Sequence, residues 1–154
     1  MPEAHHLAQL NVGRLRAPRE DPAIAEFMAG LDPVNARADA ADGFVWRLQT
    51  EEGNATSITP TDDPQWIINL SVWTGLEELR SFVYRDAEHL RYLRRRREWF
   101  EKVNTVLVLW WVPAGHVPSI DEALARLAHL EAHGPAPHAF TFRAAYPAPD
   151  ALAA

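Results

Sequence analysis

Three side chains on one predicted helix could do chemistry, and they lie where apolar side chains are expected. On a helical wheel of residues 85–103, with about 100° per residue, His89, Arg96 and Arg97 fall near the centre of the buried face. Two guanidinium groups and an imidazole are tolerated on such a face only when they have partners or line a cavity. We therefore interpret them as one wall of a small-molecule pocket.

A facing wall is predicted on the strand at residues 66–73. Asn69, Ser71 and Trp73 share one face of this strand because successive side chains point to opposite faces. Amide and hydroxyl groups in an otherwise apolar strand need hydrogen-bond partners, which a pocket with a few polar groups would supply. Other candidate substrate contacts lie on neighbouring strands or beside the cationic side chains: Gln9, Asn11, Trp46, Tyr92 and Trp99.

These residue types suit proton transfer next to a developing negative charge. His89 would carry the proton, because an unperturbed imidazole has a pKa of about 6.5. Arg96 and Asn69 would be catalytic donors that stabilise an oxyanion or enolate of the substrate. The tryptophan side chains would pack against the rings of the substrate.

A structural role is the alternative for each of these residues. Arg97 would then extend to the edge of the helix, and His89 would be a hydrogen-bonded core residue. Arg96 would pair with a carboxylate such as that of Asp86. The two interpretations differ in what replaces water around the Arg96 guanidinium.

The residues predict neither a metal site nor a cofactor. The chain has no cysteine, so thiolate ligands, disulfides and a cysteine nucleophile are excluded. His129 and His133 have the i,i+4 spacing of two ligands on a helix, but no third ligand is near them in the sequence. There is no Gly-rich phosphate loop, nucleophile elbow or HExxH motif.

The elements that must position these side chains alternate along the chain. The order β-α-β-β-α-β followed by a C-terminal helix is that of the split-βαβ, ferredoxin-like fold. We therefore predict an α+β single domain over residues 1–154, with a four-stranded antiparallel sheet, helices on one face and a frayed tail at 147–154. Strands are expected at 6–13, 44–49, 66–73 and 106–112, helices at 22–41 (interrupted at Asp32–Pro33), 75–102 (broken near Tyr84–Asp86) and 119–133, and a mobile loop at 50–65.

The strands at 66–73 and 106–112 are apolar on both faces, whereas a half-exposed antiparallel strand should alternate. Helices on one side of the sheet would leave an apolar patch too large for a soluble monomer. We predict that a second copy of the chain covers it, in a homodimer. The alternative is a monomer in which the C-terminal helix folds across the second face.

Length and charge limit the partners and the location. The chain has 154 residues and a net charge of −6, which does not favour nucleic acid as a partner. Its longest apolar run is about half of the roughly 20 residues of a membrane helix, and residues 1–10 lack the basic-then-apolar order of a signal peptide. We expect a cytoplasmic protein with no membrane partner.

Several segments resemble an uncharacterised bacterial family, domain-of-unknown-function family 3291. These are GFVWRLQ, NLSVW, RRREWF, LVLWWVPAGHVPS, EALARLAHLEAHGP and AFTF, and the resemblance runs from about Leu7 to Tyr146. The family is similar to the dimeric α/β barrels, in which two ferredoxin-like sheets pack face to face. The resemblance thus implies the same homodimer as the strand pattern.

The dimeric α/β-barrel superfamily includes antibiotic-monooxygenase-like cofactor-free enzymes, isomerases and cyclases, haem enzymes and stress proteins. In the cofactor-free monooxygenases an Asn and a Trp four residues apart on the third strand act with a following Arg, and Asn69, Trp73 and Arg96 match these positions. The helix here is longer and more basic than in that pattern. In the haem enzymes a proximal histidine binds the iron, for which His89 or His116 would be the candidates.

We predict a small-molecule-binding homodimer that is an enzyme, such as a cofactor-free monooxygenase or an isomerase/cyclase, acting on an aromatic or polyketide-like compound. The alternatives are a non-catalytic ligand-binding or stress-related dimer, and a haem-binding protein.

Overall fold

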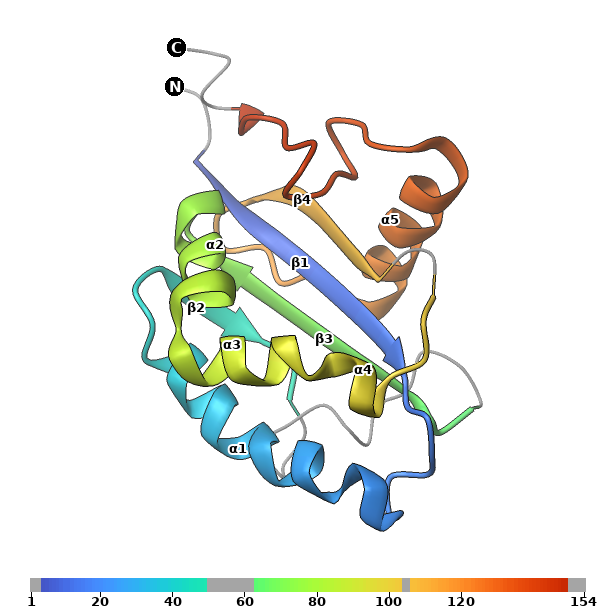
Figure 1. Ribbon diagram of the computed structural model, residues 1–154. Helices are drawn as coiled ribbons and strands as arrows, with labels where there is room; N and C mark the ends of the chain where they lie inside the picture. Colours follow the sequence, from blue (N-terminus) through green and yellow to red (C-terminus); the bar gives the residue numbers. More distant parts are fainter. Residues whose placement is uncertain (1–3, 50–62, 104–105, 150–154) are drawn as a thin grey trace.

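A computed structural model describes residues 4–49, 63–103 and 106–149 of the chain. Its centre is a four-stranded antiparallel sheet with the strand order β2-β3-β1-β4 (Figure 1). This order and the succession of helices and strands confirm the predicted α+β, ferredoxin-like fold. The strands are β1 (His5–Arg14), β2 (Phe44–Arg47), β3 (Trp66–Trp73) and β4 (Leu107–Pro113).

The helices are η1 (Pro22–Ile24), α1 (Ala25–Asp39), α2 (Leu76–Arg85), α3 (Ala87–Arg94), α4 (Arg96–Trp99) and α5 (Ile120–His133). Side-chain caps begin three of them: Asp21 accepts from the backbone N–H of Ala23, Asp86 from that of His89, and Ser119 from that of Glu122. No helix in the described ranges is long and apolar enough to cross a membrane.

The predicted interruption of α1 at Asp32–Pro33 is wrong, because α1 continues through Pro33. A proline inside a helix leaves the carbonyl four residues earlier without its N–H donor. Here that residue is Ala29, and both Ala29 and Pro33 are exposed. Water can therefore solvate the freed carbonyl.

The helical region at 75–102 is broken twice. At Asp86 the backbone is extended, and the Asp86 carboxylate accepts from the backbone N–H of His89 to begin α3. At Arg95 (φ −99°, ψ 6°) the chain turns again between α3 and α4. The first break was predicted, whereas the second was not, and it changes which side chains share a face.

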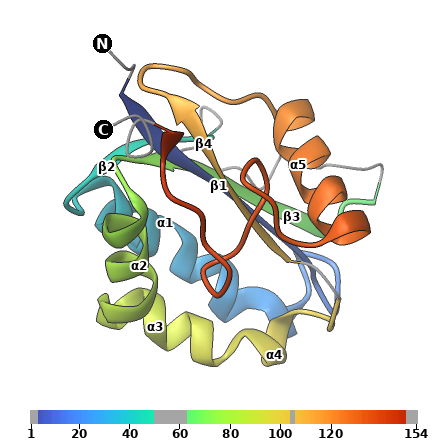
Figure 2. The same cartoon turned by 90° about the horizontal axis from the view of Figure 1, so that it is seen from above.

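Helices cover both faces of the sheet (Figure 2). As predicted, α1 to α4 pack on one face. On the other, α5 packs against an apolar cluster that includes Leu70, Val108 and Trp110, all fully or almost fully buried. The C-terminal helix α5 of the same chain thus covers the second apolar face of the sheet. This is the arrangement given above as the alternative to a homodimer.

The C-terminal segment after α5 returns to the sheet at β4. Phe140 exchanges both backbone hydrogen bonds with Leu109, each at 2.8 Å, and so extends the sheet by one residue at this edge. Trp111 Nε1 donates to the Tyr146 carbonyl at 2.9 Å. Residues 150–154 of the predicted frayed tail (147–154) and residues 50–62 of the predicted mobile loop (50–65) lie outside the described residues.

Candidate functional site

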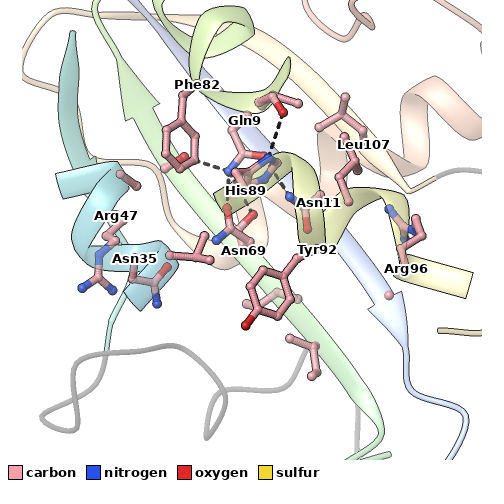
Figure 3. Close-up of a pocket in the computed structure, with 18 of the residues that line it drawn as sticks. Gln9, Asn11, Asn35, Arg47, Asn69, Phe82, His89, Tyr92, Arg96 and Leu107 are labelled. Atoms are coloured by element: carbon pink, nitrogen blue, oxygen red, sulfur yellow. Dashed lines mark hydrogen bonds between the residues drawn. The ribbon is translucent and has the colours of Figure 1, made fainter. Parts of the chain in front are cut away.

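A cavity of about 360 Å³ lies between the sheet and the helices α1 to α4. Its floor comes from β1 and β3, and its roof from α1 and from α2 to α4 (Figure 3). The volume is within the range of small-molecule sites, and the lining is mainly apolar. The structure brings these sequence-predicted residues together there: Asn11, Asn69, Ser71, Trp73, His89, Tyr92, Arg96 and Trp99.

An amide and hydroxyl network crosses the floor of the cavity. Gln9 Nε2 donates to Asn69 Oδ1 at 2.5 Å and to Ser71 Oγ at 2.7 Å. Ser71 Oγ also accepts from Trp73 Nε1 at 2.9 Å. Gln9 is almost fully buried, and Asn11 Nδ2 donates to its oxygen at 3.4 Å. Because Asn69 Oδ1 is bonded to Gln9, the Asn69 NH₂ group remains as a donor toward the cavity.

His89 enters the cavity with a defined tautomer. Its Nδ1 lies 2.9 Å from the carbonyl oxygen of Val83, and because a carbonyl can only accept, Nδ1 carries the hydrogen. In the neutral ring Nε2 is then an acceptor, and no hydrogen bond among the described residues uses it. Burial lowers the pKa of His89 below its ordinary value, despite the opposing effects of the Val83 carbonyl and Asp86. The imidazole is therefore neutral near pH 7.

Arg96 is a partly buried cation at the start of α4. Its Cζ lies 5.4 Å from the centroid of the Phe100 ring. Burial lowers the pKa of Arg96, and among the described residues no carboxylate pairs with it. Asp86, proposed above as its structural partner, instead accepts from Arg37 at 2.9 Å. The environment of Arg96 is thus one that an anionic ligand would complete.

Two predicted substrate contacts are misplaced, so the structure corrects them. Arg97 is exposed and lies outside the cavity, because the turn at Arg95 separates it from the wheel on which it was placed. Trp46 packs on the opposite face of the sheet, in the cluster beneath α5. The register of β2 against β3 shifts between Phe44 and Trp46, so these two residues do not share a face.

The register shift in β2 brings Arg47 into the cavity, a residue that the sequence did not indicate. Arg47 Nε donates to Asp39 Oδ1 at 2.7 Å. Asn35 of α1 also lines the cavity. No Asp or Glu is among the described lining residues, although the chain carries 21 acidic and 15 basic residues. This contrast favours a ligand with negative charge.

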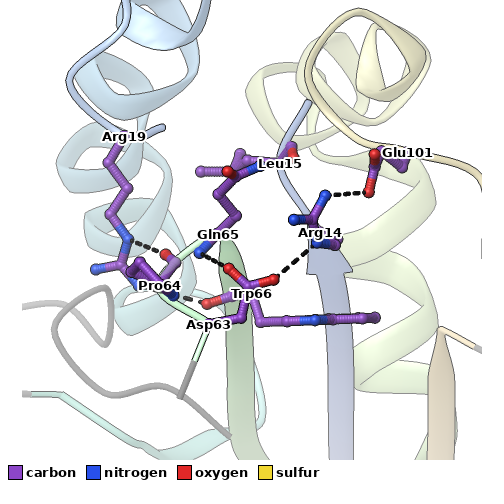
Figure 4. A network of polar contacts seen from close by, with 8 residues as sticks. All are labelled: Arg14, Leu15, Arg19, Asp63, Pro64, Gln65, Trp66 and Glu101. Carbon is purple, nitrogen blue, oxygen red and sulfur yellow. Dashed lines mark hydrogen bonds and ion pairs between the residues drawn. The ribbon is translucent and has the colours of Figure 1, made fainter. Parts of the chain in front are cut away.

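A polar network lies at the end of β1 (Figure 4). Arg14 donates to Asp63 at 2.9 Å and to Glu101 at 2.7 Å. This fixes the segment after α4, in which Phe100 lies against Gly13; a Cβ on Gly13 would come within 2.5 Å of that ring. The hydrogen bond from the Gln65 backbone N–H, followed by that from Arg14, lowers the pKa of Asp63.

The chain is an α+β, ferredoxin-like protein with a cavity between the sheet and the helices α1 to α4, and several solved structures are similar to it. The solved structure of Rv0793 from Mycobacterium tuberculosis superposes with a TM-score of 0.50 at 14% identity, over 74% of this chain and 99% of that one. SnoaB, a cofactor-independent oxygenase from Streptomyces nogalater, gives 0.46 at 16% identity, over 74% and 97%. A putative antibiotic biosynthesis monooxygenase from Nitrosomonas europaea gives 0.49 at 10% identity, over 77% and 98%.

The chain belongs to the family described as Domain of unknown function (DUF3291), which it matches over residues 6–154. This confirms the family resemblance. None of the curated proteins matches the chain.

Proposed function

We propose that the protein is a small-molecule-binding enzyme that removes a proton from an aromatic or polyketide-like compound and stabilises the resulting anion. The observation that carries the proposal is Arg96: a partly buried guanidinium that faces a mainly apolar cavity, with no carboxylate partner among the described residues. A buried charge without a partner is costly, and a ligand anion would supply the missing partner.

His89 would be the proton acceptor. Its Nδ1–H is held by the Val83 carbonyl, so the lone pair on Nε2 is the basic site. The lowered pKa keeps the ring neutral, which is the form that a general base needs.

Arg96 and Asn69 would bind the oxygen that becomes negative as the proton leaves. Donors that are already oriented favour the anion over the neutral substrate, which is how such a site lowers a barrier. Gln9 holds the Asn69 amide, and Asn11 supplies a further amide next to it. The aromatic side chains of Trp73, Tyr92 and Trp99 would contact the rings of the substrate.

The resulting enolate or phenolate is the intermediate from which two reactions can start. Its carbon can react with O₂, as in a cofactor-free monooxygenase, or attack or accept a proton elsewhere, as in a cyclase or isomerase. Neither course requires a cofactor from the protein.

The test has a binding and a reaction arm. Isothermal titration should show that 2-naphthoate binds more tightly than its neutral analogue, 2-naphthamide. Oxygen uptake should be measured with anthrone, whose C–H is acidic because the anion is an aromatic phenolate. The His89→Gln variant should lose the uptake, whereas His116→Gln should retain it because His116 is exposed and pairs with Glu122 outside the cavity.

Equal affinity for the two naphthalenes would refute an anion site. Anion binding without any turnover would favour the non-catalytic ligand-binding protein. A Soret band after addition of haemin, lost in His89→Gln, would favour the haem-binding alternative.

We also propose that the protein is a homodimer. With α5 over one face of the sheet, the support comes from β2, an edge strand on which Val45 is 40% exposed and Trp46 is half-buried. Light scattering should report about twice the chain mass of 17.4 kDa. A folded monomer at high micromolar concentration would refute it.

A further inference from the structure

The segment after α5 supplies one wall of the cavity. Phe140 is fully buried and anchored on β4 through its two hydrogen bonds with Leu109. Two residues later, Phe142 lines the cavity, as do Leu107 of β4 and Val106, the residue just before β4. The wall at this edge of the sheet is thus built by a segment outside the β-α-β-β-α-β core.

Phe142 meets an aromatic residue of α2 at this wall. The rings of Tyr84 and Phe142 are T-shaped, with centroids 5.6 Å apart. Tyr84 lines the cavity and is also 49% exposed, so the pair lies where the cavity opens to solvent. We call Tyr84 and Phe142 the aromatic rim.

Arg80 holds the aromatic rim in place. Its guanidinium carbon lies 5.8 Å from the centroid of the Phe142 ring, and its Nη2 donates to the Phe142 carbonyl at 3.4 Å. Its Nη1 pairs with Glu77 at 2.8 Å. Phe142 is therefore fixed from the outside by a charged residue and from the cavity side by apolar packing.

We infer that the aromatic rim determines specificity by limiting the size of the ring system that the cavity admits. This rests on the proposed function, because it concerns the ligand whose anion Arg96 would bind. A ligand held by its charge at Arg96 has little freedom to move away from a wall that its rings contact. Rings that extend past the rim would have to displace Phe142 from packing that includes Arg80.

Two carboxylates with different ring systems test the inference: 2-naphthoate and pyrene-1-carboxylate. The parent protein should bind the smaller one more tightly. In Phe142→Ala and in Tyr84→Ala the ratio of the two dissociation constants should shift toward pyrene-1-carboxylate by about tenfold or more, a typical effect of reshaping an apolar pocket. Arg143→Ala is the matched control, because Arg143 is exposed on the same segment and does not line the cavity.

The outcomes separate the two proposals. Arg96→Met should weaken both carboxylates equally and leave their ratio unchanged; a ratio that shifts only in the rim variants supports the rim even if Arg96→Met has no effect. An unchanged ratio in both rim variants overturns the inference, as does equal binding of the two probes by the parent. If Phe142→Ala does not fold, as judged by circular dichroism, the half-exposed Tyr84 decides through Tyr84→Ala. If neither probe binds the parent, the rim and the proposed function both fail.

Discussion

Replacing Arg96 by methionine separates a ligand-binding cation from a structural one. Methionine retains an unbranched apolar stem and removes the charge with its five donors. Because no carboxylate among the described residues pairs with Arg96, the substitution strands no partner charge. The two hypotheses therefore predict different changes in stability as well as in binding.

The expected loss of stability is small. The contact of Arg96 with the Phe100 ring, at 5.4 Å, is of the kind worth about 0.5–1 kcal/mol. Burial removes water from the Arg96 guanidinium and thereby lowers its pKa. Removing the charge also removes this cost of desolvation. We expect the free energy of unfolding to change by less than about 1 kcal/mol, which is a shift in Tm of about 2–4 °C at most for a chain of this size. A broken buried ion pair would instead cost about 3–5 kcal/mol.

The expected loss of affinity for 2-naphthoate is large. A hydrogen bond to a charged group contributes about 1.5–3 kcal/mol, which corresponds to about 10- to 150-fold in Kd. Thermal melts followed by circular dichroism and isothermal titration measure the two quantities. Arg97→Met is the control, since Arg97 is the adjacent exposed arginine and lies outside the cavity. Severe destabilisation of Arg96→Met, or equal effects of the two variants on affinity, would refute the reasoning.

Three further predictions concern the walls of the cavity. Burial lowers the pKa of His89, so the imidazole binds a proton more readily in the unfolded chain than in the folded one. The free energy of unfolding should therefore fall as the pH drops below about 6.5, by at most about 1.4 kcal/mol per pH unit from this group. His89→Gln should remove that part of the slope in urea titrations, and an unchanged slope would contradict it. Gly30→Ala should destabilise the protein by about 1–3 kcal/mol, because a Cβ there would lie 2.3 Å from the Tyr92 ring; a neutral effect in thermal melts would show that Tyr92 moves freely. Gln9→Leu should cost about 1–3 kcal/mol by leaving Asn69 Oδ1 without its donor and Ser71 Oγ with only the donor Trp73. The same variant should weaken 2-naphthoate binding because the Asn69 amide is no longer oriented; wild-type affinity would argue against that positioning role.

The sequence alone determined the order of the elements and several of the polar and aromatic residues that line the cavity. Hydrophobic periodicity and caps predicted the four strands and α5, because these signals are local. The parity of a strand placed Asn69, Ser71 and Trp73 on one face, and that face lies under α1 to α4. Polar and cationic residues at apolar positions drew attention to His89 and Arg96, and both line the cavity.

Only the tertiary structure decided the features that depend on contacts between distant segments. The turn at Arg95 moved Arg97 to the surface, and the shifted register of β2 exchanged Trp46 for Arg47 in the cavity. Neither feature has a local sequence signal. For β2 the reason is that a register is set by the pairing of two strands. The pairing of Gln9 with Asn69 and the return of Phe142 to the cavity likewise join residues far apart in the chain. The apolar second face of the sheet was visible in the sequence, but whether α5 or another chain covers it depends on the path of the backbone after β4.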